Sequence, residues 1–132
     1  MRLFSFLLFT LFSTTLFCQQ IDVQHYRFQV ALSDENDRIN SLATLAIAFP
    51  ETTKGFSLNL IQQKANGKGM KVENVKGKNV ASFKQENDQL TIELSNATGP
   101  AAVDTFEILY SGVPADGLII SKNKFGDRTF FF

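Results

Sequence analysis

Alternation of apolar and polar residues is the feature that most constrains the fold of this chain. The segment 104–114 (DTFEILYSGVP) places Phe106, Ile108 and Tyr110 on one side, before a glycine and a proline end the pattern. Side chains of an extended strand point alternately to two faces, so a period of two residues predicts a β-strand. We therefore expect a core strand here, and most of the preceding chain repeats the pattern.

The same periodicity predicts six further strands and a sheet made by local pairing. In the first of them the apolar parity changes near Gln24 and His25, which predicts a bend or bulge. The first two strands are expected to form a hairpin around the polar turn 33–37. The segment 61–69 is predicted to be a loop or a weak edge, and the segment 95–104 a loop. The six predicted strands are 21–33, 38–49, 56–60, 70–75, 80–85 and 89–94.

Short strands, short turns and the absence of a helical period predict the fold class. We expect an all-β domain, an antiparallel sandwich or a curved saddle-like sheet of about seven or eight short strands, following a signal peptide. The 132 residues are enough for one domain with a real core. Lysine plus arginine equals aspartate plus glutamate at 13 each, so no basic excess favours nucleic acid as a partner.

The first 18 residues have the layout of a secretory signal peptide. Met1 and Arg2 precede the apolar run 3–17, which is too short to span a membrane as a helix. Cleavage is predicted after Cys18, leaving residues 19–132 as an exported domain, periplasmic or secreted, without a stable membrane anchor. Lipid anchoring through Cys18 is not expected, because Phe17 is large where a lipoprotein signal needs a small residue.

The sequence predicts no catalytic, cofactor-binding or metal-binding residue. His25 is the one histidine and Cys18 the one cysteine, so neither an HExxH zinc site nor a catalytic triad can be assembled. Asp34, Glu35 and Asp37 lack the spacing of a calcium loop and are interpreted as a solvated turn.

Three other patterns have structural interpretations. The glycines at 67, 69 and 77 lack the strand-before, helix-after context of a phosphate loop and are expected in turns. Asn96-Ala97-Thr98 fits the glycosylation acceptor pattern. The basic stretch is expected to form a solvated edge that discourages aggregation; it consists of Lys64, Lys68, Lys71, Lys76 and Lys78.

The carboxyl end carries three phenylalanines, Phe130 to Phe132. Exposed rings at a free terminus invite aggregation. Either these rings dock into the sandwich as a last strand, or the chain is a fragment whose continuation covers them.

The order and spacing of these motifs together resemble one known family. The residues that carry the likeness are Tyr26-x-Phe28-x-Val30-x-Leu32, Ile39-x-Ser41-x-Ala43-Thr44-Leu45-x-Ile47, Phe56-x-Leu58-Asn59-Leu60, Leu90-x-Ile92-x-Leu94, Phe106-x-Ile108-x-Tyr110-x-Gly112-x-Pro114 and Gly126-x-Arg128-Thr129-Phe130-Phe131.

From 21 to 132 the chain resembles the amino-terminal β domain of the aminopeptidase N-like zinc metallopeptidases, the gluzincin aminopeptidases. It departs from the family at Ser41, where glycine is usual, and in extent, because the family's substrate-anchoring loop and HExxH domain lie further on. The resemblance implies a saddle-shaped β module, incomplete at its carboxyl end, that packs on a zinc-dependent catalytic domain and helps to wall its cleft.

Two functions of different class follow. The leading hypothesis is the structural amino-terminal domain of a secreted zinc aminopeptidase, inactive alone, whose partner is the catalytic domain absent from this chain. The alternative is a standalone exported β-sandwich binding module that contacts a polymer or protein through its loops.

Overall fold

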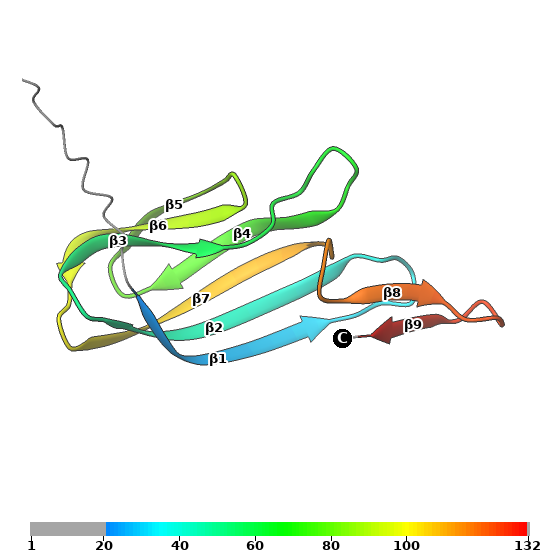
Figure 1. Cartoon of the computed structure of the whole chain (residues 1–132), viewed down its shortest axis with the longest axis horizontal. Helices are drawn as coiled ribbons and strands as arrows, with labels where there is room; N and C mark the ends of the chain where they lie inside the picture. Colours follow the sequence, from blue (N-terminus) through cyan, green and yellow to red (C-terminus); the bar gives the residue numbers. More distant parts are fainter. Residues whose placement is uncertain (1–20, 132) are drawn as a thin grey trace, which may run out of the picture.

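The computed structural model describes residues 21–131, which form nine strands and no helix (Figure 1). The all-β prediction is confirmed. The predicted signal peptide with Cys18, and the terminal Phe132, lie outside the described residues. No helix long and apolar enough to cross a membrane occurs between residues 21 and 131. The strands are β1 (Asp22–Ala31), β2 (Ile39–Phe49), β3 (Thr53–Asn59), β4 (Gly69–Gly77), β5 (Val80–Glu86), β6 (Gln89–Thr98), β7 (Ala102–Val113), β8 (Ile119–Lys122) and β9 (Arg128–Phe131).

Two antiparallel sheets pack face to face. The large sheet has the strand order β1-β2-β7-β4 and the small sheet the order β3-β6-β5, while β8 and β9 pair separately. The predicted hairpin of the first two strands is confirmed, with Tyr26 opposite Leu45 and Phe28 opposite Ala43. The predicted core strand lies in β7, which ends at Val113 and pairs with β2 on one side and β4 on the other. The sandwich architecture is therefore the predicted one.

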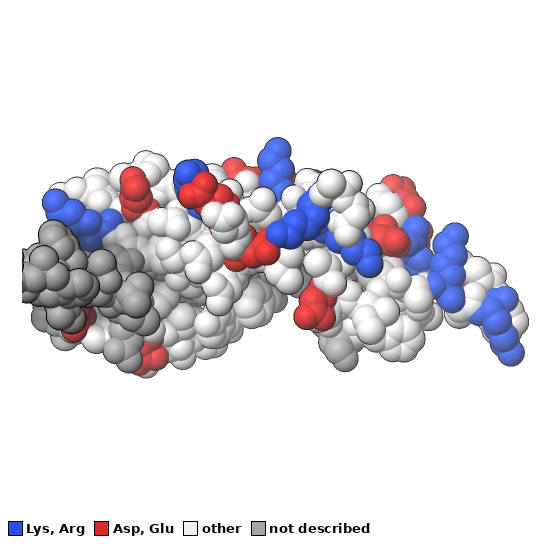
Figure 2. Space-filling model, turned by 45° about the horizontal axis from the view of Figure 1, so that its top comes forward, with Lys and Arg blue, Asp and Glu red and all other residues white. Residues whose placement is uncertain are grey.

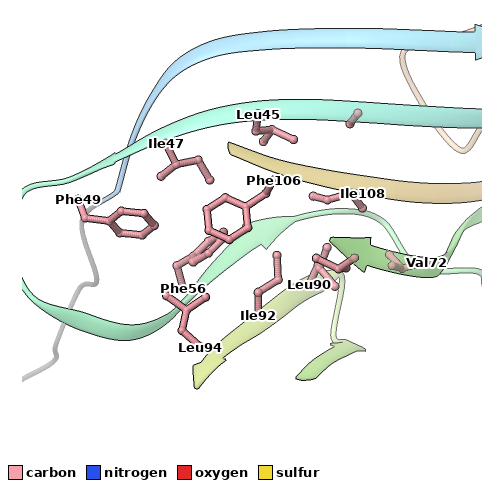
Figure 3. Packing of buried hydrophobic residues seen from close by; sticks show 12 residues of the cluster. Leu45, Ile47, Phe49, Phe56, Val72, Leu90, Ile92, Leu94, Phe106 and Ile108 are labelled. Atoms are coloured by element: carbon pink, nitrogen blue, oxygen red, sulfur yellow. The ribbon is translucent and has the colours of Figure 1, made fainter. Parts of the chain in front are cut away.

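The core between the sheets centres on three phenylalanine rings (Figure 3). Phe106 of β7 is fully buried and meets Phe56 of β3 edge-to-face at 4.8 Å between ring centroids. Phe49 at the end of β2 contacts both rings in the same geometry, at 5.6 Å and 6.2 Å. Edge-to-face pairs add to the hydrophobic effect of burial. Strands β2, β6 and β7 supply aliphatic neighbours on both sides of this trio.

Bulges set which side chains enter the core. The bend predicted near Gln24 is confirmed as a register shift between Val23 and His25 in β1. A second shift, between Val72 and Asn74 in β4, lets Val72 and Val75 both be buried although their sequence parity differs. An extra residue in one strand moves every following side chain to the other face. The pattern of period two therefore breaks at these points without ending the strand.

The predicted loop 95–104 is shorter than expected. Strand β6 continues to Thr98 and β7 begins at Ala102, so a tight turn with Gly99 at φ 106° replaces most of it. The Thr98 hydroxyl donates to an Asp104 carboxylate oxygen at 2.9 Å, across this turn. Polar composition misled the prediction, because a strand tolerates polar residues such as Ser95 and Asn96 where it is exposed to solvent. The pattern Asn96-Ala97-Thr98 lies in the extended part of β6.

The strand count exceeds the prediction because a hairpin, β8–β9, follows the sandwich. Phe130 lies opposite Ile120 in this hairpin and is half-buried, whereas Phe131 is 54% exposed. Phe130 and Phe131 thus belong to a last strand, although its partner is β8 and not an edge of the sandwich. Figure 1 shows the hairpin beside the end of β1.

Arg128 joins this hairpin to the turn between β1 and β2. Its Nε donates to the carbonyl oxygen of Asp34 at 2.8 Å, and Nη2 donates to the carbonyl oxygen of Glu35 at 3.3 Å. Nη1 forms an ion pair with the Asp37 carboxylate. The acidic turn, interpreted from the sequence as solvated, therefore binds a guanidinium through two backbone carbonyls and one carboxylate.

Replacing Arg128 with methionine is expected to loosen the hairpin without unfolding the sandwich. Hydrogen bonds to a charged group contribute about 1.5–3 kcal/mol each, so amides of 119–131 and 33–37 should exchange with deuterium roughly tenfold faster. Hydrogen exchange measured by mass spectrometry checks this. Lys122→Met, on the strand opposite Arg128, is the control and should change neither segment. Equal protection in the two variants would contradict the role given to Arg128.

Candidate functional site

An apolar groove of about 540 Å³ opens along one side of the sandwich. Its walls come from both sheets and from the edge strands β1 and β3. No charged side chain lines it. A concave apolar surface of this size is the usual form of a binding site. Apolar and aromatic side chains that line it include Tyr26, Phe28, Leu58, Leu60, Ile108 and Tyr110.

The groove is open because only one of the two sides of the sandwich is closed. On the far side, β4 and β5 follow one another in the chain through a short turn, and Gln85 links them. The Val72 N–H donates to Gln85 Oε1 at 3.0 Å, and Gln85 Nε2 donates to the Met70 carbonyl at 3.1 Å. On the groove side, β1 and β3 are the two sheet edges, and no described segment bridges them.

The bulge in β1 gives the groove its apolar wall. Ile21 and Val23 precede the bulge and have odd parity, whereas Tyr26 and Phe28 follow it and have even parity. All four side chains line the groove, because the inserted residue brings both sets to the same face. A regular strand would turn one of the two pairs to the outer side.

Two aromatic rings of this wall are exposed to solvent. Tyr26 is 53% and Phe28 57% exposed, and their rings stack at 5.8 Å between centroids. Val30 continues the stripe along the same strand, and Leu32 extends it just beyond the end of the strand. The small sheet has three strands against four in the large sheet, and it covers β1 only around its start, where Ile21 and Val23 pack against the core. Contiguous exposed apolar surface rimmed by polar residues marks interaction sites.

The outer surface carries no field of one sign on the face that Figure 2 shows. Lys and Arg alternate with Asp and Glu over it, and basic side chains gather at the end where Figure 1 places the β8–β9 hairpin. Lys124 at that hairpin's tip lies 4.8 Å from the centroid of the exposed Phe125 ring. The groove is therefore distinguished by its apolar character rather than by charge.

The residues considered in the sequence as possible ligands or catalytic groups do not form a common site in the structure. His25 is exposed beside the β1 bulge, and the turn with Asp34 and Asp37 binds Arg128. Among residues 21–131, no group of three or more His, Cys, Asp or Glu side chains is placed to hold a metal ion. The prediction that the chain has no site residue stays a prediction. The groove itself was missed, although the stripe from Tyr26 to Leu32 was its signal.

A polar cluster on the outer face of the large sheet explains one buried serine. Arg38 Nη2 donates to Ser111 Oγ at 2.6 Å, and Ser111 Oγ donates to Glu73 Oε1 at 2.5 Å. Glu73 is the extra residue of the β4 bulge, which re-aims its side chain toward β7. The cluster joins β4 and β7 to Arg38, the residue before β2. Because its hydrogen bonds tie these three segments together, we interpret it as structural.

Asp88, in the turn between β5 and β6, supports the wall formed by Leu60. The Lys64 ammonium donates to both carboxylate oxygens, at 2.6 Å and 2.7 Å, and the Gln62 N–H donates at 3.0 Å. The Leu60 N–H donates to the Asp88 carbonyl at 2.9 Å. The hydrogen bond from Lys64, followed by that from the Gln62 amide, lowers the pKa of the Asp88 carboxyl below its usual value.

A lowered pKa gives Asp88 a defined effect on pH dependence. Its contribution to stability is present above the unfolded-state pKa and is lost as the pH falls through the folded-state pKa. We expect Lys64→Met to move the NMR titration midpoint of Asp88 upward, toward the usual aspartate value. Lys84→Met, which removes the exposed pair with Glu86, is the control and should leave the midpoint of Asp88 unchanged. An unmoved midpoint in Lys64→Met would contradict the assignment.

Comparison with known proteins finds solved structures with a similar fold. No protein-family model matches the chain, and no curated protein matches it. The M1 zinc metallopeptidase of Deinococcus radiodurans matches with a TM-score of 0.59 and 20% identity over 71% of this chain. A variant of it bound to a Tyr-Ser-Ala substrate matches with a TM-score of 0.59 and 18% identity over 77%. A two-domain M1 zinc metallopeptidase variant bound to L-tryptophan matches with 0.58 and 18% over 79%.

These matches cover only 20–22% of the metallopeptidase chains, so this chain spans about a fifth of the length of the structures it resembles. At such identity the likeness shows the fold. The resemblance to aminopeptidase N-like zinc metallopeptidases is thereby confirmed for the architecture, which is that of one β-rich part of those proteins. The metal of those relatives has no counterpart among the described residues, which hold no suitable ligand cluster.

Proposed function

We propose that residues 19–132 act as the amino-terminal structural domain of a secreted zinc aminopeptidase. In this proposal the domain packs on a catalytic domain absent from this chain and helps to wall the active-site cleft. The observation that carries it is the fold match, which covers 71–79% of this chain and about a fifth of each M1 zinc metallopeptidase. A part of a larger enzyme also accounts for apolar surface such as Tyr26 and Phe28 that the described residues leave bare.

Catalysis in this proposal belongs to residues outside the chain. Zinc would supply a Lewis acid that activates water, and the described residues offer no cluster to hold it. What residues 21–131 contribute is a rigid support: a bulged edge strand, an apolar groove and a hairpin held in place by Arg128.

The test reads the gene beyond codon 132 and assays both products. A continuous frame that encodes HExxH, with a product that releases arylamine from an aminoacyl-arylamide in the presence of zinc, is the expected result. The 132-residue chain with added zinc should release none. A stop codon followed by an unrelated gene, or hydrolysis by the short chain, would refute the proposal.

Export is part of the proposal and has its own test. The apolar run 3–17 and the predicted cleavage after Cys18 support a periplasmic or secreted location. Expression of the intact gene in a bacterial host, followed by amino-terminal sequencing of the processed protein, should find Gln19 as the first residue. A chain that retains Met1 and stays in the cytoplasm would refute export.

The groove supports one alternative, a standalone exported binding module of β-sandwich type. A groove of about 540 Å³ with no charged lining suits an apolar segment of a partner. The two functions separate in the same gene-reading experiment, because a binding module needs no catalytic domain in its frame.

A further inference from the structure

We propose that the groove receives one extended strand of another domain, with apolar residues facing inward and acidic residues facing solvent, which pairs with the free edge of β1. The inference rests on the proposed function, in which this strand belongs to the catalytic domain encoded beyond codon 132. It adds the binding mode and the chemistry of the partner.

In the described structure, the backbone of β1 is unpaired along one edge. Within residues 21–131, β1 pairs with β2 alone over the ten residues Asp22–Ala31. Its other side therefore presents a row of backbone N–H and C=O groups without sheet partners. An added strand satisfies these groups through ladder hydrogen bonds, whereas a helix lying on the same edge would not. The long free edge thus selects an extended occupant.

The side chains that such a strand would contact are apolar and regularly spaced. Tyr26, Phe28 and Val30 lie at every second position on the inner side and are 53%, 57% and 39% exposed. Leu58 and Leu60 form the opposite wall, on the small sheet and just after it. A strand repeats its inward side chains with the same spacing as β1, so alternate apolar residues interleave with this wall. The uncharged lining excludes acidic or basic side chains from the inward positions.

The solvent-facing side of β1 carries a positive charge. Arg27 lies on that side, opposite the neutral Thr44 of β2, and makes no ion pair in the described part of the chain. His25 and Gln29 flank it, and neither is acidic. Opposite charges on directly facing strand residues are stabilising, so a carboxylate opposite Arg27 is favoured.

The same charges argue against a second copy of this chain. Antiparallel self-pairing centred on Arg27 sets that guanidinium against its own copy, which is destabilising. A pairing that sets Asp22 against Arg27 overlaps only residues 22–27 and leaves Phe28 and Val30 uncovered. No self-pairing therefore satisfies the edge, the aromatic wall and the charge together.

The experiment uses the purified chain and synthetic strands of about ten residues, the length of β1. The probe is a fluorescein-labelled peptide of alternating valine and glutamate, followed by fluorescence anisotropy. A valine–lysine peptide tests the charge preference. Two copies of the glutamate peptide, N-methylated at every second residue in opposite phases, test the need for backbone donors.

The glutamate peptide should bind about tenfold tighter than the lysine peptide, and Arg27→Glu should invert that order. One of the two N-methylated peptides should lose at least about tenfold in affinity, because its methyl groups occupy the edge that faces β1. Phe28→Ser should weaken binding about tenfold, while Val103→Ser, a control that is 59% exposed on β7, should stay within about twofold. Strand content measured by circular dichroism should be the same in all variants.

Equal binding of both N-methylated peptides, or of the glutamate and lysine peptides, would overturn the strand proposal. A dimer in sedimentation that dissociates in the Phe28→Ser variant would also overturn it, because the occupant would then be a second copy of this chain. These outcomes are distinct from those of the proposed function. A full-frame product that hydrolyses arylamides, beside a chain that binds no peptide, refutes the strand and leaves the peptidase domain standing.

Discussion

Replacing Phe106 with alanine is expected to lower the free energy of unfolding by about 3–5 kcal/mol, the range for deleting a buried aromatic ring. Phe106 has no exposed surface, and its ring contacts those of Phe49 and Phe56 from opposite sheets. Domains of this size are stable by roughly 5–15 kcal/mol, so the loss is a large fraction of the total. Urea unfolding followed by circular dichroism measures it. Packing between the sheets holds the groove walls in place, and peptide binding should fall with stability.

The matched control is Phe125→Ala. Phe125 is 77% exposed at the tip of the β8–β9 hairpin, and its removal should change the free energy of unfolding by less than about 0.5 kcal/mol. Both substitutions delete the same atoms, so their difference isolates burial. If the two variants unfolded at the same urea concentration, the phenylalanine trio would not be the centre of the core.

Replacing Gly69 with alanine is expected to destabilise the fold by about 2–6 kcal/mol, from a strained backbone and a steric clash of about 1–3 kcal/mol each. Gly69 has φ 107°, and a Cβ there would lie 2.1 Å from the carbonyl oxygen of Gln62. That oxygen belongs to the segment that β4 pins beside the groove, through the Met70 N–H bond to the Ile61 carbonyl at 2.7 Å. Thermal or urea unfolding measures the loss.

Gly67→Ala separates the two causes. Gly67 also has a positive φ, 81°, but no atom lies within 4 Å of its added Cβ. We expect a cost of about 1–2 kcal/mol, that of a left-handed backbone alone. An equal cost at both glycines would show that the close approach of the 61–69 segment to β4 is not needed.

Much of the architecture was predictable from the alternation of apolar residues. Each of the seven predicted strands exists, and the bulge near Gln24 was visible as a change of parity. A last strand at the phenylalanines was one of two alternatives, whereas β8 and its pairing with β9 were missed, because four-residue strands hold too few alternations to be read. Its anchor, Arg128, contacts Asp34 and Asp37 across more than ninety residues of sequence, a pairing that local pattern cannot reveal.

The candidate site, too, was only partly predictable from the sequence. Sequence alone showed an apolar stripe from Tyr26 to Leu32, as it showed one from Ala43 to Phe49, and nothing in either segment tells which is covered. Strand order decides that: β2 lies inside the large sheet beneath the small one, whereas β1 is an edge that the three-stranded sheet leaves bare from Tyr26 onward. Periodicity is a property of one strand, and it determined the all-β fold and the faces of each strand. Burial is a property of the neighbours that long-range pairing brings, so only the tertiary structure could place the groove.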